Sequence, residues 1–176
     1  GGLHPRKRQL NIGESGLATR LFTPITALCT ETITLTGKGS ILKRPISMME
    51  EPLRQLGATV SSQGGYLPIH IRGAIRGGNI TVDGSLSSQF ITGLLMALPL
   101  LDEASSLTVT GQMESAAYIA MTESVLNRGG IALRRSGSVW HIPGGQRCRF
   151  PADIRAEGDW SNAAFFLCMK SEAKRS

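Results

Sequence analysis

The stretch Val82-Asp83-Gly84-Ser85-Leu86-Ser87-Ser88-Gln89-Phe90 places a glycine, several hydroxyls and an amide directly before a strongly apolar run. A similar stretch, Glu157-Gly158-Asp159-Trp160-Ser161, follows later, and its glycine lies 74 residues after Gly84. Gly13-Glu14-Ser15-Gly16 precedes a third apolar run. Recurrence of one pattern at a fixed spacing is typical of a chain built from repeated units.

Three further pairs of short motifs repeat in the same order and at almost the same spacing. Each pair is separated by 73 or 74 residues. They are Leu35-Thr36-Gly37 with Val109-Thr110-Gly111, Leu56-Gly57-Ala58-Thr59 with Gly129-Gly130-Ile131-Ala132, and Leu67-Pro68-Ile69 with Trp140-His141-Ile142. The sequence therefore predicts a duplicated unit of about 74 residues, with the chain opening at one unit's helix and closing inside another.

Periodicity predicts the elements of one unit. Short runs rich in β-branched residues indicate strands at Ile33–Thr36, Thr59–Val60, Tyr66–Ile71 and Ile80–Val82. Apolar residues at helical spacing indicate helices at Gly16–Leu28, Pro45–Leu56, Ser87–Leu100 and Trp160–Met169. Pro52 is expected to kink its helix or delay its start. The order is an α/β arrangement that reads βαβαββ after a circular shift.

Composition restricts the class of protein. With 176 residues, 41% hydrophobic and 18% charged, the chain is long enough for one domain or slightly more with a true core. No apolar run reaches the ~20 residues of a membrane span, and the basic N-terminus has no apolar stretch of a signal peptide behind it. Three cysteines without a C-x-x-C motif favour a reducing, cytoplasmic setting.

The net charge of +6 favours encounters with anions without specifying which anion. The expected helix starts expose unpaired N–H groups, which suit a phosphate or carboxylate. On pattern alone, ordinary helix capping by Ser, Asp and Gly is the favoured interpretation of the same residues. Arg44 could pair with such an anion or lie in solvent, and Ser115 and Tyr118, near the equivalent place in the second unit, could donate hydrogen bonds to a ligand or simply pack on their helix.

Other functional patterns are missing from the sequence. It has no phosphate loop ending in Gly-Lys-Ser, no dinucleotide-binding fingerprint, and no His or Cys cluster with the spacing of metal ligands. The basic residues are scattered and few aromatic residues are available for stacking on bases. A basic, repeat-built nucleic-acid-binding domain remains an alternative hypothesis that rests on charge alone.

Taken together, these motifs resemble the 5-enolpyruvylshikimate-3-phosphate synthase (3-phosphoshikimate 1-carboxyvinyltransferase) family. The resemblance runs from about Leu10 to Met169, and its most specific part is the Ser87-Ser88-Gln89 signature. It implies domains of three βαβαββ units around a pseudo-threefold axis. It also implies transfer of the enolpyruvyl group of phosphoenolpyruvate to the 5-hydroxyl of shikimate 3-phosphate, on the shikimate pathway to chorismate and aromatic amino acids, with no metal or organic cofactor.

The resemblance also implies roles for individual residues. Shikimate 3-phosphate is expected to bind Ser87, Ser88, Gln89, Ser115 and Tyr118, and phosphoenolpyruvate is expected to bind Gly16, Arg44 and Gln89. No catalytic residue of the family falls within this chain, so the chain alone is expected to be inactive. Ala116-Ala117, Ala120 and Leu17 depart from the residues usual at their positions in the family.

The domain organisation and partners follow in the same way. Residues 1–155 are expected to form the N-terminal type of enolpyruvyl transferase domain without its first part, and residues 156–176 to begin the next segment or the crossover to a second domain. The expected partners are the two small substrates and that C-terminal domain of the same chain, in a cytoplasmic monomer without nucleic acid or membrane. A UDP-N-acetylglucosamine enolpyruvyl transferase is a second alternative, although none of Cys29, Cys148 and Cys168 lies in that enzyme's type of reactive-cysteine loop.

Overall fold

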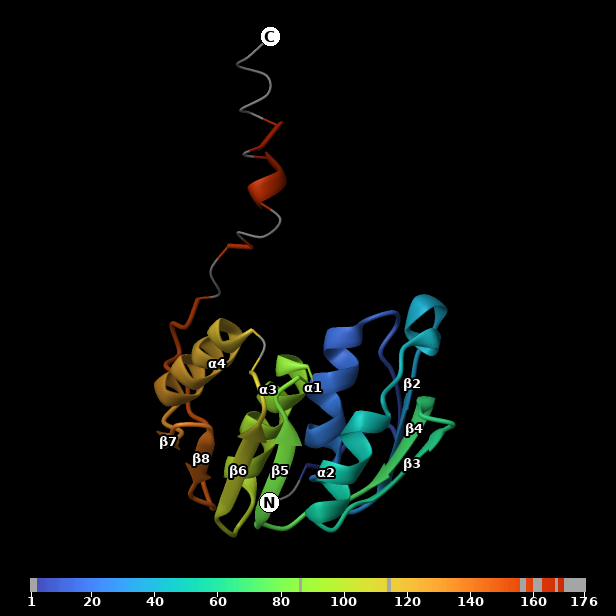
Figure 1. The fold of residues 1–176 in the computed structure, drawn as a ribbon, viewed down its shortest axis with the longest axis horizontal. Coiled ribbons are helices and arrows are strands. Elements are labelled where there is room, and N and C mark those ends of the chain that lie inside the picture. Colours follow the sequence, from blue (N-terminus) through green and yellow to red (C-terminus); the bar gives the residue numbers. More distant parts are fainter. Residues whose placement is uncertain are drawn as a thin grey trace.

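A computed structural model describes residues 3–85, 87–113, 115–155, 158–159, 163–166 and 168–169. Two four-stranded mixed sheets flank a pair of helices (Figure 1). The first unit contains β1 (Gln9–Asn11), α1 (Gly16–Thr26), β2 (Thr32–Thr36), α2 (Glu50–Gln55), β3 (Thr59–Gln63) and β4 (Tyr66–Arg72). The second contains β5 (Asn79–Asp83), α3 (Ser88–Ala97), β6 (Ser105–Thr110), α4 (Ala116–Arg128), β7 (Arg134–Ser136) and β8 (Val139–Ile142).

The two sheets have the same topology. The strand order is β1-β2-β4-β3 in the first sheet and β5-β6-β8-β7 in the second. In each sheet the first two strands pair in parallel and the other pairs are antiparallel. Each unit is therefore βαβαββ, which confirms the predicted duplication and the α/β class.

The ends of α2 and α4 repeat in detail. Gly57 and Gly130, which lie 73 residues apart, both adopt a positive φ just after their helices, at 92° and 80°. In both units the next residue donates its backbone N–H to a carbonyl five residues earlier, at 3.0 Å: Ala58 to Leu53 and Ile131 to Leu126. Only glycine adopts this backbone conformation without steric cost, which explains why the motif marks the repeat so clearly.

One strand was not predicted, one predicted helix begins later than expected, and one predicted helix lies partly outside the described residues. Strand β1 was not predicted, so the chain opens with a strand rather than a helix. The helix expected from Pro45 begins only at Glu50, after the 3-10 turn η2 (Ser47–Met49), which places Pro52 in its first turn, where proline is tolerated. The helix expected over Trp160–Met169 lies partly outside the described residues. Of its residues that the structure describes, 163–166 and 168–169 are helical.

The central contact of the fold is between α1 and α3 (Figure 1). Phe90, Ile91 and Leu94 of α3 are fully buried there. Gly93 allows the close approach, because a Cβ at this position would lie 2.9 Å from the carbonyl oxygens of Arg20 and Leu21. This contact brings the side of α1 that carries Arg20 next to the first turns of α3.

In the described part of the chain, every helix is too short or too polar to cross a bilayer. The 3-10 turns η1 (Gly39–Lys43) and η3 (Leu98–Leu100) complete the set of elements. η1 matters for the site because it ends directly before Arg44.

Candidate anion-binding site

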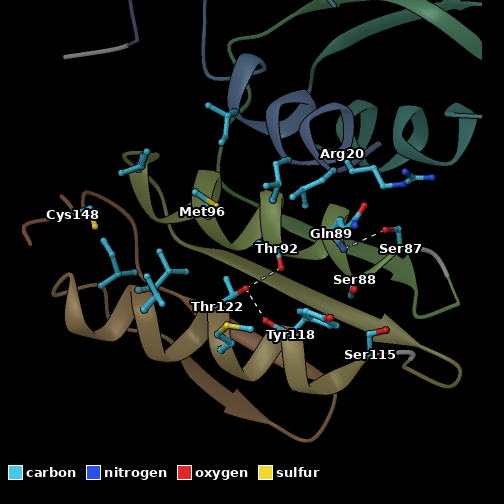
Figure 2. A pocket seen from close by; sticks show the side chains of 18 of the residues that line it. Arg20, Ser87, Ser88, Gln89, Thr92, Met96, Ser115, Tyr118, Thr122 and Cys148 are labelled. Atoms are coloured by element: carbon cyan, nitrogen blue, oxygen red, sulfur yellow. Dashed lines mark hydrogen bonds between the residues drawn. The ribbon is translucent and has the colours of Figure 1, made fainter. Parts of the chain in front are cut away.

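A cavity of about 1150 Å³ lies between α1, α3 and α4 (Figure 2). Its polar lining gathers around the start of α3 and the facing turn of α4, whereas Met96 and Cys148 lie at the opposite end (Figure 2). The apolar lining includes Leu17, Ile25, Met96, Met121, Val125 and Phe150.

The start of α3 supplies two serines with different tasks. Ser87 is the N-cap, and its hydroxyl accepts a hydrogen bond from the Gln89 backbone N–H at 3.3 Å. Ser88 is the first helical residue, lines the cavity, and its hydroxyl has no hydrogen-bond partner within the described residues. Capping and ligand binding, which the sequence left as alternatives, are thus both possible within one motif. The helix dipole adds a partial positive charge at the same place.

A tight turn leads the chain from β5 towards this helix start. The Asp83 carboxylate accepts the backbone N–H of Ser85 at 2.8 Å. This backbone hydrogen bond, followed by one from the Ser85 side chain, holds the pKa of Asp83 below its ordinary value. The carboxylate therefore stays ionised and keeps the turn formed at all but strongly acidic pH.

Arg20 also lines the cavity, although the sequence analysis assigned it no role. Its Nη1 donates to the Gly16 carbonyl oxygen at 3.2 Å, while its buried Nε has no partner. Burial, and then the positive charge of Arg44, lower the pKa of the Arg20 guanidinium, which nonetheless remains charged. A partly buried arginine with an unused donor and a like charge beside it is the arrangement that an anionic ligand would complete.

Gly16 and Arg44 lie beside Arg20 but do not themselves line the cavity. A Cβ on Gly16 would stand 2.9 Å from Nη1 of Arg20 and 3.3 Å from Nη1 of Arg44. Gly16 and Arg44, the two residues expected to bind phosphoenolpyruvate, are therefore next to the cavity through Arg20, which lines it. Among the described residues, neither guanidinium forms an ion pair with a carboxylate.

Ser115 and Tyr118 approach the cavity from α4. Ser115 stands at the N-cap position with φ 56°, and its hydroxyl makes no capping bond. Tyr118 is 60% exposed, so its ring is not packed into the core. The hydroxyls of Thr92 and Thr122 meet at 3.0 Å and Thr122 donates to the Tyr118 carbonyl at 2.9 Å, which links α3 to the turn that carries Tyr118 (Figure 2).

The lining of this cavity, as far as the structure describes it, includes no Asp, Glu, His or Lys. The arrangement therefore presents hydrogen-bond donors and one positive charge, and no carboxylate or imidazole among its described lining residues.

Fold and site together define a class: an α/β protein of duplicated βαβαββ units with a cavity between α1, α3 and α4 that is polar at the start of α3. The sequence profile of the family described as EPSP synthase (3-phosphoshikimate 1-carboxyvinyltransferase) matches residues 2–170. The chain belongs to this family.

Individual relatives agree with this assignment. The chain is 38% identical over 162 residues to the 3-phosphoshikimate 1-carboxyvinyltransferase of Serratia proteamaculans (strain 568), covering 90% of this chain and 38% of that protein. It is also 38% identical over 161 residues to the enzyme of the same name from Yersinia pestis bv. Antiqua (strain Angola), with the same coverage of both chains. A solved EPSP synthase from Acinetobacter baumannii superposes with a TM-score of 0.75 at 28% identity, covering 93% of this chain and 36% of that one.

The chain thus spans little more than a third of the length of these relatives. The family assignment does not favour the two alternatives, the UDP-sugar enolpyruvyl transferase and the nucleic-acid-binding domain.

Proposed function

We propose that this chain carries the shikimate 3-phosphate binding site of an enolpyruvyl transferase. The enzyme would transfer the enolpyruvyl group of phosphoenolpyruvate to the 5-hydroxyl of shikimate 3-phosphate, with release of phosphate. The observation that carries the proposal is the convergence of Ser87, Ser88, Gln89, Ser115 and Tyr118 on one cavity that also holds the unpaired Arg20. These are donors suited to a phosphoryl group and to ring hydroxyls.

At the start of α3, the free hydroxyl of Ser88 and the helix N-terminus would bind the phosphoryl group of shikimate 3-phosphate. Ser115 and Tyr118 would contact the same ligand from α4. Gln89 lies between this region and Arg20 (Figure 2), so its amide can reach both substrates.

The second substrate, phosphoenolpyruvate, carries a phosphate and a carboxylate. Arg44 and Arg20 would neutralise part of this charge, and the small Gly16 leaves room for their guanidinium groups beside the backbone. Arg20 is added here to the residues expected from the sequence, because its buried Nε needs an acceptor.

We also propose that residues 1–155 form one domain and that residues 156–176 lead towards a second, which would carry the proton-transfer groups. The greater length of the relatives supports this division. Closure of two domains over the cavity would exclude water and bring the remaining groups to the substrates. The proposed location is the cytoplasm, where cysteines such as Cys29 and Cys148 stay reduced, and the proposed oligomeric state is a monomer.

Isothermal titration of the 176-residue chain with shikimate 3-phosphate and phosphoenolpyruvate tests the proposal. We expect weak binding of both, strengthened when the two are present together. A matched titration with shikimate, which lacks the phosphate, should give a much smaller signal. Equal affinity for shikimate and its phosphate would contradict the proposed role of Ser88 and the helix start.

A further inference from the structure

The carboxylate of Glu14 lies at the N-terminal end of the 3-10 turn η1. Its Oε2 accepts the backbone N–H of Ser40 at 3.2 Å and the Ser40 hydroxyl at 3.3 Å. η1 has no cap from its own N-cap residue, Lys38. Glu14 therefore provides the cap from a different segment, 26 residues earlier in the chain, and satisfies a donor that would otherwise be unpaired.

Gly39 makes room for this contact. Its φ is +63°, and a Cβ there would stand 2.4 Å from the Glu14 carboxyl carbon. A side chain at this position would displace the carboxylate. The hydrogen bonds between Glu14 and Ser40 therefore depend both on the acid at position 14 and on the glycine at position 39.

At its other end, η1 is joined directly to Arg44. Arg44 is the C-cap residue, and its backbone N–H bonds to the Ile41 carbonyl at 3.1 Å. Ile41 is fully buried and would lie 3.7 Å from a Cβ on Gly16. A backbone bond of 2.9 Å from Lys38 to the Gly13 carbonyl holds the two loops together at the start of the turn.

We propose that Glu14 is a positioning residue that holds Arg44 against Gly16 by fixing η1 to the loop before α1. The inference rests on the proposed function, because it assigns Glu14 to the phosphoenolpyruvate half of that site. The Glu14 carboxylate is bound to Ser40 at the start of η1, so it acts through η1 and Arg44 rather than on the ligand.

Removal of the Glu14 carboxylate should strengthen phosphoenolpyruvate binding if Glu14 acts only through its charge, and weaken it if Glu14 positions Arg44. A nearby carboxylate repels an anionic ligand, so on charge alone its removal would strengthen phosphoenolpyruvate binding. If Glu14 positions Arg44, the Glu14→Ala variant binds phosphoenolpyruvate about fivefold or more weakly. Glu14→Gln retains an acceptor for Ser40 and should stay within about twofold of the original chain or bind more tightly.

The experiment is an NMR titration of the 176-residue chain that follows backbone amides and arginine Nε–H signals. Glu51→Ala is the control for loss of an exposed glutamate, and Ser40→Ala should give a smaller loss than Glu14→Ala. Shikimate 3-phosphate affinity should stay unchanged in Glu14→Ala. Unchanged or tighter phosphoenolpyruvate binding by Glu14→Ala overturns the inference.

A second readout needs no ligand and separates this inference from the proposed function. Nuclear Overhauser contacts between Gly16 and the Arg44 side chain should be present in the original chain and in Glu14→Gln and absent in Glu14→Ala. Their persistence in a folded Glu14→Ala variant overturns the inference. If the original chain shows these contacts but its signals do not respond to phosphoenolpyruvate, the proposed function fails while the positioning role stands.

Discussion

Arg20 and Arg44 lie side by side, with their Nη1 atoms 2.9 Å and 3.3 Å from the point where a Cβ would stand on Gly16. Burial, and then the positive charge of Arg44, disfavour the charged form of Arg20 and lower the pKa of its guanidinium. A protein that holds two like charges together without an acidic partner loses some stability, and that loss is a common property of binding sites.

The Arg20→Met variant should separate stability from binding. Methionine keeps much of the side-chain length but removes the charge and the unpaired Nε. We expect the free energy of unfolding to be unchanged or to rise by up to about 1 kcal/mol, because a buried unsatisfied donor disappears. Phosphoenolpyruvate affinity should fall by about tenfold or more, since a charge-assisted hydrogen bond is lost.

Arg76→Met is the matched control for Arg20→Met. Arg76 is exposed and lies outside the cavity. Calorimetric titration and urea denaturation of both variants provide the comparison. If Arg20→Met lowers stability as a core substitution would and leaves ligand affinity intact, the arginine is structural.

The two serines at the start of α3 should respond differently to alanine. Ser87→Ala removes an N-cap and should lower the free energy of unfolding by about 1 kcal/mol. Ser88→Ala removes a hydroxyl without a protein partner and should change stability by less than about 0.5 kcal/mol while weakening shikimate 3-phosphate binding. Thermal denaturation and titration of the pair measure both effects, and the reverse pattern would argue against the assignment.

Gly16→Ala tests how closely the arginine pair approaches the helix start. The added methyl group would displace Arg20 and Arg44, while alanine in a first turn favours the helix. We expect near-normal stability with clearly weaker phosphoenolpyruvate binding. Gly78→Ala is a suitable control, because a Cβ at that position meets no atom within 4 Å. Equal phosphoenolpyruvate affinity in the two variants would show that the close approach of Arg20 and Arg44 to Gly16 does not contribute to binding.

The threonine pair between α3 and α4 should fix the separation of the two halves of the site. Thr92→Val keeps the shape of the side chain but breaks the 3.0 Å hydroxyl contact with Thr122. A loss of about 1 kcal/mol is expected, because the Thr122 hydroxyl keeps only its bond to the Tyr118 carbonyl. Tyr118 amide and ring signals should shift in the NMR spectrum. The exposed Thr81→Val control on β5 should leave them in place, and identical spectra for both variants would contradict the link.

The fold could be predicted where local chemistry enforces it. Gly57 and Gly130 mark the repeat because each has a positive φ that other residues avoid. Strand β1 could not be predicted, since the three residues Gln9-Leu10-Asn11 are too few to establish an alternation and gain their order from pairing with β2.

The site could be predicted only in part. Ser88 and Gln89 belong to a recognisable motif, whereas Arg20 alone on a helix is indistinguishable in sequence from a solvated arginine. Its role depends on the tertiary approach of α1 to α3 at Gly93. The division of tasks between Ser87 and Ser88 likewise depends on which residue begins the helix, a boundary that sequence patterns locate poorly.

The most direct measurement is a ¹⁵N-resolved NMR titration of this chain with shikimate 3-phosphate. The account predicts saturable shifts concentrated at Ser88, Gln89, Ser115 and Tyr118, with no comparable response on the outer strands β3 and β7. Shifts that are absent at millimolar ligand, or that gather away from the start of α3, would contradict it.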